Sequence, residues 1–481
     1  MSETARALSS RPRRLLMISH AFPPVGGAGV QRSAMFAKFL PQFGWSPLVW
    51  TADYVVGWPR DESLLADLPA DLDRRSLDTL KRRNRRQRRS TVPVGGALHA
   101  RARGALGQMW AWRVARARWG FRQWLLPDDQ VLWAFASLRC LKRIARDEGI
   151  DAIYSTYSPA SSHLLAWRLK EATGKPWVAD FRDLWTDNYD HTDRSKIRRG
   201  ARSWFQDRFL GAADVVVGVS PDQTRILAGH LPEQASKFVT VTNGVDPADF
   251  EGLEQNDARG QLGISSDRFV VSYVGTITTD DHPGEMFQGI RKFVEYLGDQ
   301  RGRFELRIVG RISGALLRVV EAAGYRAVLT GYVPHGDAIR EMVAADCLLL
   351  MNPVVGTNCA SVRPAKIYEY LASGRYILHL GVPGGASDEV IAACNGGETI
   401  LPDPDLICRK LRELWTRWLS GRPSRGCSPE RLAPFTRREL TGRLAGILDG
   451  LLIRDPQMRD SHQSCPDRVS GGIPRIAIRG L

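Results

Sequence analysis

Cysteine pairs are missing from this 481-residue sequence. Its seven cysteines are scattered along the chain, with no C-x-x-C pair and no histidine partner at metal-binding spacing. This pattern argues against a disulfide framework and against a zinc site, and a reduced cytosol fits it best. The cysteines are Cys140, Cys347, Cys359, Cys394, Cys408, Cys427 and Cys465.

Long apolar runs are missing as well. Residues 1–14 carry charge but no apolar segment of signal-peptide length, and no uninterrupted apolar run reaches the length of a membrane span. We therefore expect a protein that is soluble or lies on a membrane surface.

Acidic residues are fewer than basic residues, with 52 Asp and Glu against 67 Lys and Arg, which gives a net charge of +15 and a pI near 9.8. Such a balance calls for an anionic partner, and charge alone does not choose among nucleic acid, a membrane surface and phosphorylated substrates. Residues 79–127 contain no acidic residue at all, and residues 81–89 are almost wholly basic. This segment is not ordinary core.

A helix in the same segment is predicted to have one apolar and aromatic face. On a helical wheel this face comprises Leu106, Trp110, Val114, Ala117, Phe121 and Trp124, and arginines 113, 116, 118 and 122 surround it. The composition is typical of a helix that binds an anionic membrane surface. The alternative is a helix packed on the first domain with a solvated arginine face, preceded by a disordered basic loop.

The rest of the chain alternates between short apolar runs and helical patterns. Runs at 15–19, 47–51, 151–155, 176–180, 214–220 and 238–242 predict one parallel sheet, with a helix through 164–170. After the turn signature at 243–247, runs at 269–274, 304–309, 327–330, 346–351 and 376–380 predict a second. The first run opens into a loop with a glycine pair but lacks a strict G-x-G-x-x-G, so a dinucleotide site is not favoured.

Residues 361–375 have the pattern of a helix with a ligand at its front end. Ser361 is available as N-cap, Pro364 suits the first turn and a helix is predicted over 363–373. Arg363 and Lys366 would place positive charge where a helix N-terminus already attracts phosphate, and Glu369 could accept hydrogen bonds from ribose hydroxyls. Residues 361–375 therefore predict a binding site for a nucleotide diphosphate. The alternative is an ordinary crossover helix whose polar face forms salt bridges.

Two acidic clusters admit simpler interpretations. Asp180, Arg182 and Asp183 crowd the end of one strand, where they either form a structural ion-pair cluster or line a site. The D-x-D pattern at 403–405 lies in a proline turn, so we interpret it as loop chemistry and expect no metal.

Four motifs in this order resemble the GT-B glycosyltransferases of family 4. They are F-P-P-V-G-G at 22–27, N-G-V-D at 243–246, A-A-D at 344–346 and K-I-Y-E-Y-L-A-S-G at 366–374. The resemblance covers about residues 15–452. It implies an α/β fold of two Rossmann-like domains facing a cleft, a nucleotide-sugar donor held mainly by the second, retention of anomeric configuration, and no metal or other cofactor.

The turn signature at 243–247 marks the domain boundary, and the resemblance assigns a role to each domain. Residues 1–242 would form the acceptor domain with the basic insertion at about 79–127, and residues 243–425 would form the donor domain. Residues 426–453 would be a helix that returns to the first domain, consistent with its apolar stripe, and residues 454–481 a disordered tail.

Donor-binding residues follow by position. Glu369 resembles the glutamate that binds the donor ribose, and Gly26 and Gly27 resemble the loop that faces the donor phosphate and the acceptor. Val333 matches the place where backbone meets the base. On the acceptor side, Arg182 and Asp183 fall where many members have a His-Asp pair, and with His20 they are the candidates for acceptor positioning.

The sequence departs from the family at the diphosphate clamp. Thr276 stands where an arginine is common, and Asp280, Asp281 and His282 occupy the region of the expected lysine. Departure of a diphosphate needs compensating cations, so we expect Arg311, Arg363 and Lys366 to supply them. Ser361 stands where many relatives carry a first glutamate, and we include it among the donor-binding residues.

The resemblance therefore predicts a retaining glycosyltransferase of cell-surface polysaccharide biosynthesis in bacteria. It would move a sugar from a nucleotide diphosphate sugar to a hydroxyl of a glycan or lipid-linked acceptor, in the cytoplasm or on the inner face of the plasma membrane. One alternative is a sugar-nucleotide epimerase of the same architecture. The other is a nucleic-acid-binding protein that uses the basic insertion, although no recognised RNA or DNA module accompanies it.

Overall fold

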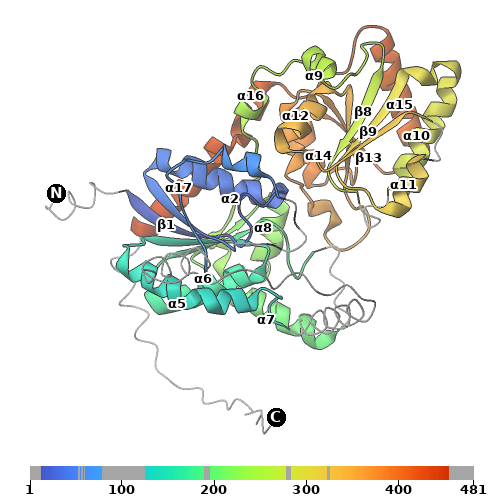
Figure 1. Cartoon of the computed structure of the whole chain (residues 1–481). Coiled ribbons are helices and arrows are strands. Elements are labelled where there is room, and N and C mark those ends of the chain that lie inside the picture. The colour runs from blue at the N-terminus through green and yellow to red at the C-terminus, as the bar shows by residue number, and fades with distance from the viewer. Residues whose placement is uncertain are drawn as a thin grey trace, which may run out of the picture.

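The structure is a computed structural model, which describes residues 12–52, 55, 58, 60–77, 125–188, 195–277, 283–321 and 325–453. It consists of two halves, each built on one sheet (Figure 1). The predicted basic run, the predicted amphipathic helix, residues 280–282 and the tail lie outside the described residues. In the part that is described, no helix is long and apolar enough to cross a membrane.

The first half is built on a seven-stranded sheet in which every pairing is parallel. Its order is β3-β2-β1-β4-β5-β6-β7. The central strands are buried on both faces, as expected for a parallel sheet covered by helices. The strands are β1 (Arg13–Ile18), β2 (Trp45–Trp50), β3 (Asp73–Arg75), β4 (Ala152–Tyr157), β5 (Trp177–Phe181), β6 (Val215–Gly218) and β7 (Phe238–Thr240).

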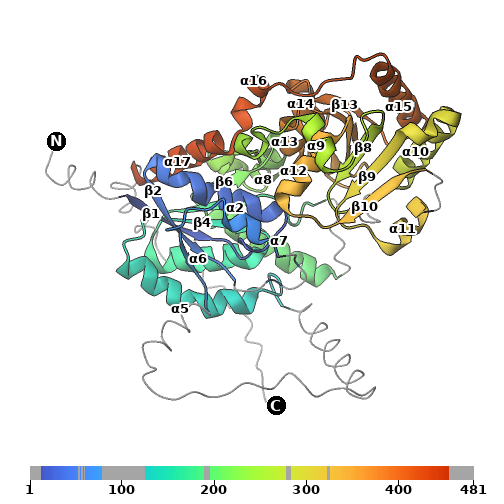
Figure 2. The same cartoon turned by 45° about the horizontal axis from the view of Figure 1, so that its top comes forward.

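Helices cover both faces of this sheet. Figures 1 and 2 show α5 and α6 on one face and α2 on the opposite face. The helices are α2 (Ala28–Phe39), α5 (Val131–Asp147), α6 (Ala160–Thr173), α7 (Lys196–Ala212) and α8 (Pro221–Ala228). Short 3-10 turns are η1 (Leu40–Phe43), η2 (Glu62–Leu65) and η3 (Pro232–Lys237), whereas η4 (Pro247–Phe250) packs on the second half.

The second half has a six-stranded parallel sheet of order β10-β9-β8-β11-β12-β13. Its strands are β8 (Phe269–Val274), β9 (Phe304–Val309), β10 (Ala327–Gly331), β11 (Cys347–Met351), β12 (Tyr376–Leu380) and β13 (Gly397–Ile400). Its helices are α9 (Gln255–Gln261), α10 (Gly284–Leu297), α11 (Gly314–Glu321), α12 (His335–Ala344), α13 (Lys366–Ala372), α14 (Ala386–Ala393), α15 (Pro404–Leu419) and α16 (Pro429–Leu432), with 3-10 turns η6 (Gly298–Arg303), η7 (Cys359–Ser361) and η8 (Ala433–Phe435).

The last helix, α17 (Arg437–Ile453), returns to the first half and packs against α2 (Figure 2). Leu440, Leu444 and Leu448 are buried in the same cluster as residues of β1 and α2. Arg13 and Asp449 add an ion pair of 2.6 Å across this contact. The predicted return of the final helix is confirmed, and its apolar stripe is buried against this half.

The start of α13 differs from the prediction. The helix begins at Lys366 rather than Arg363, and Ser361 ends a 3-10 turn in which its Oγ donates to the Asn358 carbonyl at 2.7 Å. The N-cap role predicted for Ser361 is therefore wrong. The physical reason is Pro364, whose ring disfavours helical backbone at the residue before it and so delays the helix. Gly374 ends the helix with a left-handed φ of 66°.

Candidate functional site

Two cavities lie between the halves, and each takes residues from both. The larger cavity, of about 250 Å³, is lined by Gly27, Gln31 and Asp61 of the first half and by the ends of β8, β9 and β10 and one side of α13. The smaller cavity, of about 210 Å³, is lined by Arg182, Asp183 and Gln223 of the first half and by residues 358 and 361–364 of the second. Both open at the carboxyl ends of the parallel strands, where α/β sheets bind ligands.

Five of the predicted donor-binding residues line the larger cavity. They are Gly27, Arg311, Val333, Lys366 and Glu369. Gly26 lies behind this wall, where a Cβ would come within 2.5 Å of the Tyr332 hydroxyl. Glycine is needed there because any side chain would push Tyr332 away.

Lys366 is held over the carboxyl end of β8. Its Nζ donates to the Tyr273 hydroxyl at 2.8 Å and lies 4.1 Å from the centre of that ring. A Cβ on Gly275 would lie 3.0 Å from Nζ, so the glycine leaves room for the ammonium. No carboxylate of the described residues forms an ion pair with Lys366. Its full charge is available to an anion in the cavity.

Glu369 is the carboxylate at the floor of the larger cavity. It lies in α13, is buried, and forms no hydrogen bond through its carboxylate with any residue that the structure describes. Its charge acts on His335, whose pKa is raised: burial opposes the charged imidazole, but a hydrogen bond to Asp249 and the charges of Glu369 and Asp249 outweigh it. A buried carboxylate with unused acceptor capacity suits the hydroxyl pair of a ribose.

Asp61 closes the larger cavity from the first half. Its carboxylate accepts from the Tyr332 hydroxyl at 3.1 Å and from the backbone N–H of His335 at 3.3 Å. Helix α12 starts after Pro334, which provides no side-chain cap, so the carboxylate of the opposite half satisfies its N-terminus. The sequence analysis missed Asp61 and Tyr332 because the contact joins residues 271 positions apart.

A second bridge between the halves runs through Gln31. Its Nε2 lies 3.2 Å from Nδ1 of His335, and its Oε1 accepts from Arg437 at 2.6 Å. Because Arg437 can only donate, the amide nitrogen must face His335. His335 therefore accepts through Nδ1 and donates from Nε2 to Asp249, which lies 3.2 Å away.

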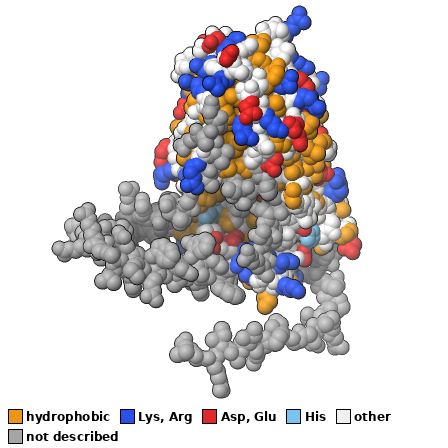
Figure 3. Space-filling model, turned by 90° about the vertical axis from the view of Figure 1, so that its right-hand side faces the viewer, with side chains coloured by type: hydrophobic (Ala, Val, Ile, Leu, Met, Phe, Trp, Pro, Cys, Tyr) orange, Lys and Arg blue, Asp and Glu red, His pale blue; other side chains and the backbone are white. Residues whose placement is uncertain are grey.

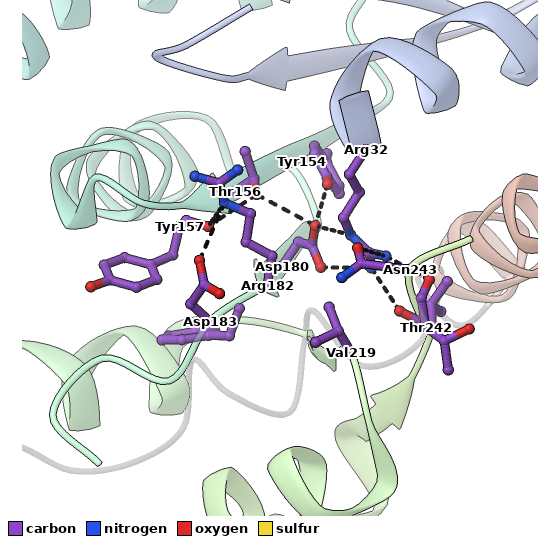
Figure 4. A network of polar contacts seen from close by, with 12 residues as sticks. Arg32, Tyr154, Thr156, Tyr157, Asp180, Arg182, Asp183, Val219, Thr242 and Asn243 are labelled. Atoms are coloured by element: carbon purple, nitrogen blue, oxygen red, sulfur yellow. Dashed lines mark hydrogen bonds and ion pairs between the residues drawn. The ribbon is translucent and has the colours of Figure 1, made fainter. Parts of the chain in front are cut away.

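Arg182 and Asp183 meet in the wall of the smaller cavity (Figure 4). The Nε of Arg182 donates to the Tyr157 carbonyl at 2.7 Å and lies 3.7 Å from Asp183 Oδ2. The amide side chains of Asn188, Gln223 and Asn358 line the same cavity. Donors and a carboxylate together can orient hydroxyl groups.

Ser361 and Arg363 also line the smaller cavity, and not the larger one. Arg363 is buried, and its guanidinium donates to the Ala386 carbonyl at 2.6 Å and to Glu389 at 3.1 Å. The charge of Arg363 is thus already compensated by Glu389. Of the cations expected to replace the missing clamp, Lys366 and Arg311 reach the cavity that contains Glu369.

His20 lies in the wall of neither cavity among the described residues. Its ring packs edge-on against Trp133 at 4.8 Å. Burial lowers its pKa to about 4, although a hydrogen bond with Gln130 and the charge of Asp129 oppose this. His20 is therefore neutral at pH 7.

The other aspartate of the acidic cluster, Asp180, belongs to a structural network (Figure 4). It is fully buried and accepts from Arg32 at 2.8 and 2.9 Å and from the Tyr154 hydroxyl. Arg32 also donates to the carbonyls of Val241 and Thr242 at 2.8 and 2.7 Å. Each of the two interpretations of this cluster therefore holds for a part of it. Asp180 forms a structural ion pair with Arg32, whereas Arg182 and Asp183 line a cavity.

In the part of the chain that the structure describes, no group of His, Cys, Asp and Glu is placed to hold a metal ion. Asp403 caps α15 by accepting from the N–H groups of Asp405 and Leu406, both at 2.9 Å.

Basic charge does not gather on the outer face of the second half. Figure 3 shows Lys and Arg interspersed there with Asp and Glu.

Comparison with known proteins shows which protein families and structures the chain resembles. Residues 85–249 match the model of Glycosyltransferase Family 4. This part of the chain is thus similar to the glycosyltransferases of family 4. A curated D-inositol 3-phosphate glycosyltransferase of Geodermatophilus obscurus is 24% identical over 228 residues, which cover 39% of this chain and 50% of that protein. The chain thus matches about half the length of this relative.

Solved structures of glycosyltransferases share the whole two-domain fold. Sucrose-phosphate synthase of Thermosynechococcus elongatus aligns with a TM-score of 0.55 at 16% identity, covering 94% of this chain and 99% of that one. WaaG, a glycosyltransferase involved in lipopolysaccharide biosynthesis, aligns with a TM-score of 0.56 at 14% identity, covering 91% and 100%. Anabaena HepE in complex with UDP-glucose aligns with a TM-score of 0.52 at 14% identity, covering 94% and 100%. The predicted GT-B fold class is confirmed.

Proposed function

We propose that this chain is a retaining glycosyltransferase that moves a sugar from a nucleotide diphosphate sugar to a hydroxyl acceptor. One observation supports the proposal most directly: two segments, one at the start of α2 and one at the start of α13, each have residues at both cavities. At the start of α2, Gly27 lines the larger cavity while Gly29 lies under Arg182 of the smaller one. Before and along α13, residues 361–364 line the smaller cavity, and Lys366 and Glu369 line the larger.

The larger cavity suits the nucleotide. Its carboxylate, Glu369, would accept hydrogen bonds from the ribose hydroxyls, and the backbone at Val333 would meet the base. Lys366 and Arg311 would neutralise the diphosphate. The UDP-glucose bound to HepE supports a donor of this class.

The smaller cavity suits the acceptor, and the reaction would take place where the two cavities meet. The bond between the anomeric carbon and the phosphate oxygen breaks, and its electron pair stays on that oxygen. The acceptor hydroxyl attacks from the same face, which retains the configuration, and a phosphate oxygen takes the acceptor proton. No strong protein base is needed, consistent with a neutral, buried His20 outside the cavity walls.

The acceptor is proposed to be a lipid-linked or polysaccharide glycan of a bacterial cell surface. The likeness to WaaG, a glycosyltransferase involved in lipopolysaccharide biosynthesis, supports this class. The basic insertion would hold the enzyme on the anionic inner face of the plasma membrane. Liposome flotation tests this: recovery should rise with anionic lipid and fall when Arg113, Arg116, Arg118 and Arg122 are replaced by glutamine.

A panel of nucleotide diphosphate sugars tests the function itself. The true donor should raise the melting temperature of the protein and release nucleoside diphosphate with an added glycan acceptor. NMR of the product should give the same anomeric configuration as the donor. Conversion of the donor to an isomer without acceptor would instead establish an epimerase. Salt-dependent oligonucleotide binding that is lost on deletion of residues 79–127, with no nucleotide-sugar binding, would establish a nucleic-acid-binding protein.

A further inference from the structure

The side chain of Arg182 is largely buried, and only one of its guanidinium nitrogens is hydrogen-bonded to a described residue. Its side chain is 10% exposed, and Nε alone is anchored, to the Tyr157 carbonyl at 2.7 Å. Neither NH1 nor NH2 has a hydrogen-bond acceptor among the described residues. Because Arg182 lines the smaller cavity, these donors are available to a ligand that enters it.

The unpaired end of Arg182 lies on the first turn of α2. A Cβ built on Gly29 would be 1.7 Å from NH1, 2.5 Å from Cζ and 2.7 Å from NH2. Only a glycine lets the guanidinium approach the helix this closely. The 12-residue helix starts after Gly27 with no side-chain cap, and its first turn holds no acidic residue.

Two positive groups therefore face each other. The start of α2 carries positive partial charge from its free N–H groups, and Arg182 adds a full charge. The nearby carboxylate of Asp183 is 61% exposed and lies 3.7 Å from Nε. An anion that contacts both the helix start and the NH1 and NH2 groups would relieve this repulsion and accept hydrogen bonds from both sets of donors.

We propose that Arg182 is a catalytic residue that binds the sugar-linked phosphate of the donor from the acceptor side. The inference rests on the proposed function and changes the role predicted for Arg182 from acceptor positioning to leaving-group stabilisation. The first turn of α2 connects the two cavities, so a phosphate there lies between Arg182 and the nucleotide cavity with Lys366. When the glycosyl C–O bond breaks, the electron pair remains on the phosphate oxygen, and Arg182 stabilises that charge.

The chemistry of this step also explains why the second half can lack a full clamp. Thr276 offers no charge at the end of β8, and Arg363 is compensated by Glu389. Arg182 supplies from the first half a charge that those positions do not provide. The phosphate would then bind tightly only when the two halves are closed.

The test replaces Arg182 by Gln and by Lys in the full chain. With the donor identified in the panel, we expect kcat for transfer to fall by about 10²–10³-fold in Arg182→Gln. Hydrolysis of the donor by water, without acceptor, should fall by the same factor. Arg168→Gln, an exposed arginine paired with Glu171, is the matched control and should leave both rates unchanged.

A second variant keeps the arginine but moves it. In Gly29→Ala the new methyl group displaces the flexible end of Arg182, so transfer and hydrolysis should both fall. Combination with Arg182→Gln should cause no further loss. A purely structural role would instead lower the melting temperature of all these variants without this non-additive pattern.

Binding of the products separates the sources of the phosphate. Calorimetry with UDP, UMP, GDP and GMP should show weaker binding of the preferred diphosphate to Arg182→Gln by about tenfold, with the monophosphate unchanged. If Arg182 instead binds a phosphate on the acceptor, donor hydrolysis and diphosphate binding will be normal and only the acceptor KM will rise. Normal transfer in Arg182→Gln overturns the inference alone, whereas wild-type protein that neither binds a nucleotide nor transfers a sugar overturns the proposed function.

Discussion

Lys366 and Tyr273 form a cation–π pair at the carboxyl end of β8, with Nζ 4.1 Å from the ring centre and 2.8 Å from the phenol oxygen. The aromatic ring positions the ammonium without neutralising it, unlike a carboxylate, which would cancel the charge. Lys366 therefore keeps its electrostatic strength for a bound anion while its position is fixed.

Replacing Lys366 by Ala should nearly abolish transfer. Removing one fixed charge from a developing anion costs about 10²–10³ in kcat, and here no clamp arginine stands at position 276 to compensate. Steady-state kinetics with the identified donor measure the effect. Lys292→Ala is the control, since this lysine pairs with Asp405 away from both cavities. Near-normal turnover of Lys366→Ala would show that Lys366 does not neutralise the donor diphosphate in the larger cavity.

Replacing Glu369 by Ala should mainly weaken donor binding. Two hydrogen bonds from ribose hydroxyls to a buried carboxylate are each worth about 1.5–3 kcal/mol, so the donor Kd should rise by at least about tenfold while kcat changes little. A 2′-deoxyribose donor gives the sharper measurement. Wild-type enzyme should bind it more weakly than the ribose donor, and Glu369→Ala should not discriminate between them. Retained discrimination in the variant would place the ribose elsewhere.

The bond between Tyr332 and Asp61 should control access to the larger cavity. Tyr332→Phe removes only the hydroxyl that holds the two halves together at 3.1 Å, so we expect faster nucleotide association and dissociation. Stopped-flow binding of a fluorescent nucleotide measures both rates. Tyr296→Phe, on the exposed surface of α10, serves as the control. Rates identical to wild type would mean that the cavity fills by another route.

The sequence predicted the strands well because a buried parallel strand is a continuous apolar run. The strands β8, β9 and β12 were predicted with their observed bounds, whereas β3 was missed because its residues, Asp-Arg-Arg, have no apolar pattern. The edge strand β13 (Gly-Glu-Thr-Ile) was missed for the same reason. An edge strand is half covered, so its sequence carries less information about its structure.

Site residues were predictable from the sequence only where they lie close together in one segment of the chain. Lys366 and Glu369 lie on one short helix, so their spacing alone placed them together. The contacts of Asp61 with α12 and of Arg182 with Gly29 join distant segments, and they depend on how the halves close. The same limit explains Arg363, whose position in sequence indicated a phosphate ligand but whose guanidinium turns to Glu389 on α14.

Breaking the buried pair of Arg32 and Asp180 should be strongly destabilising. Arg32→Met leaves a fully buried carboxylate without its counter-charge, which costs about 3–5 kcal/mol. Urea unfolding should give a lower midpoint. The double variant Arg32→Met with Asp180→Asn should recover part of this loss, because no charge stays buried. Arg225→Met, from an exposed pair with Asp222, should change stability by less than about 0.5 kcal/mol, and an equal loss in both single variants would contradict the argument.

Stability should fall as the pH rises through about 8, because of His230. Its imidazole lies 3.0 Å from Asp187 and 2.9 Å from Asp207, and the hydrogen bond to Asp187 raises its pKa to about 8 despite partial burial. A pKa raised on folding adds stability below the unfolded value of about 6.5, and this stability is lost as the pH passes the folded value.

The effect should be on the order of 1 kcal/mol, reduced by the partial exposure of the site, and a melting curve taken at each pH from 6 to 9 measures it. His230→Gln should be less stable than wild type at pH 6 and should lack this component of the pH dependence. Because the Asp187 carbonyl accepts from Asn358 of the second half at 2.9 Å, the loss should also loosen the contact between the halves. An unchanged pH dependence in His230→Gln would assign the titration to another group.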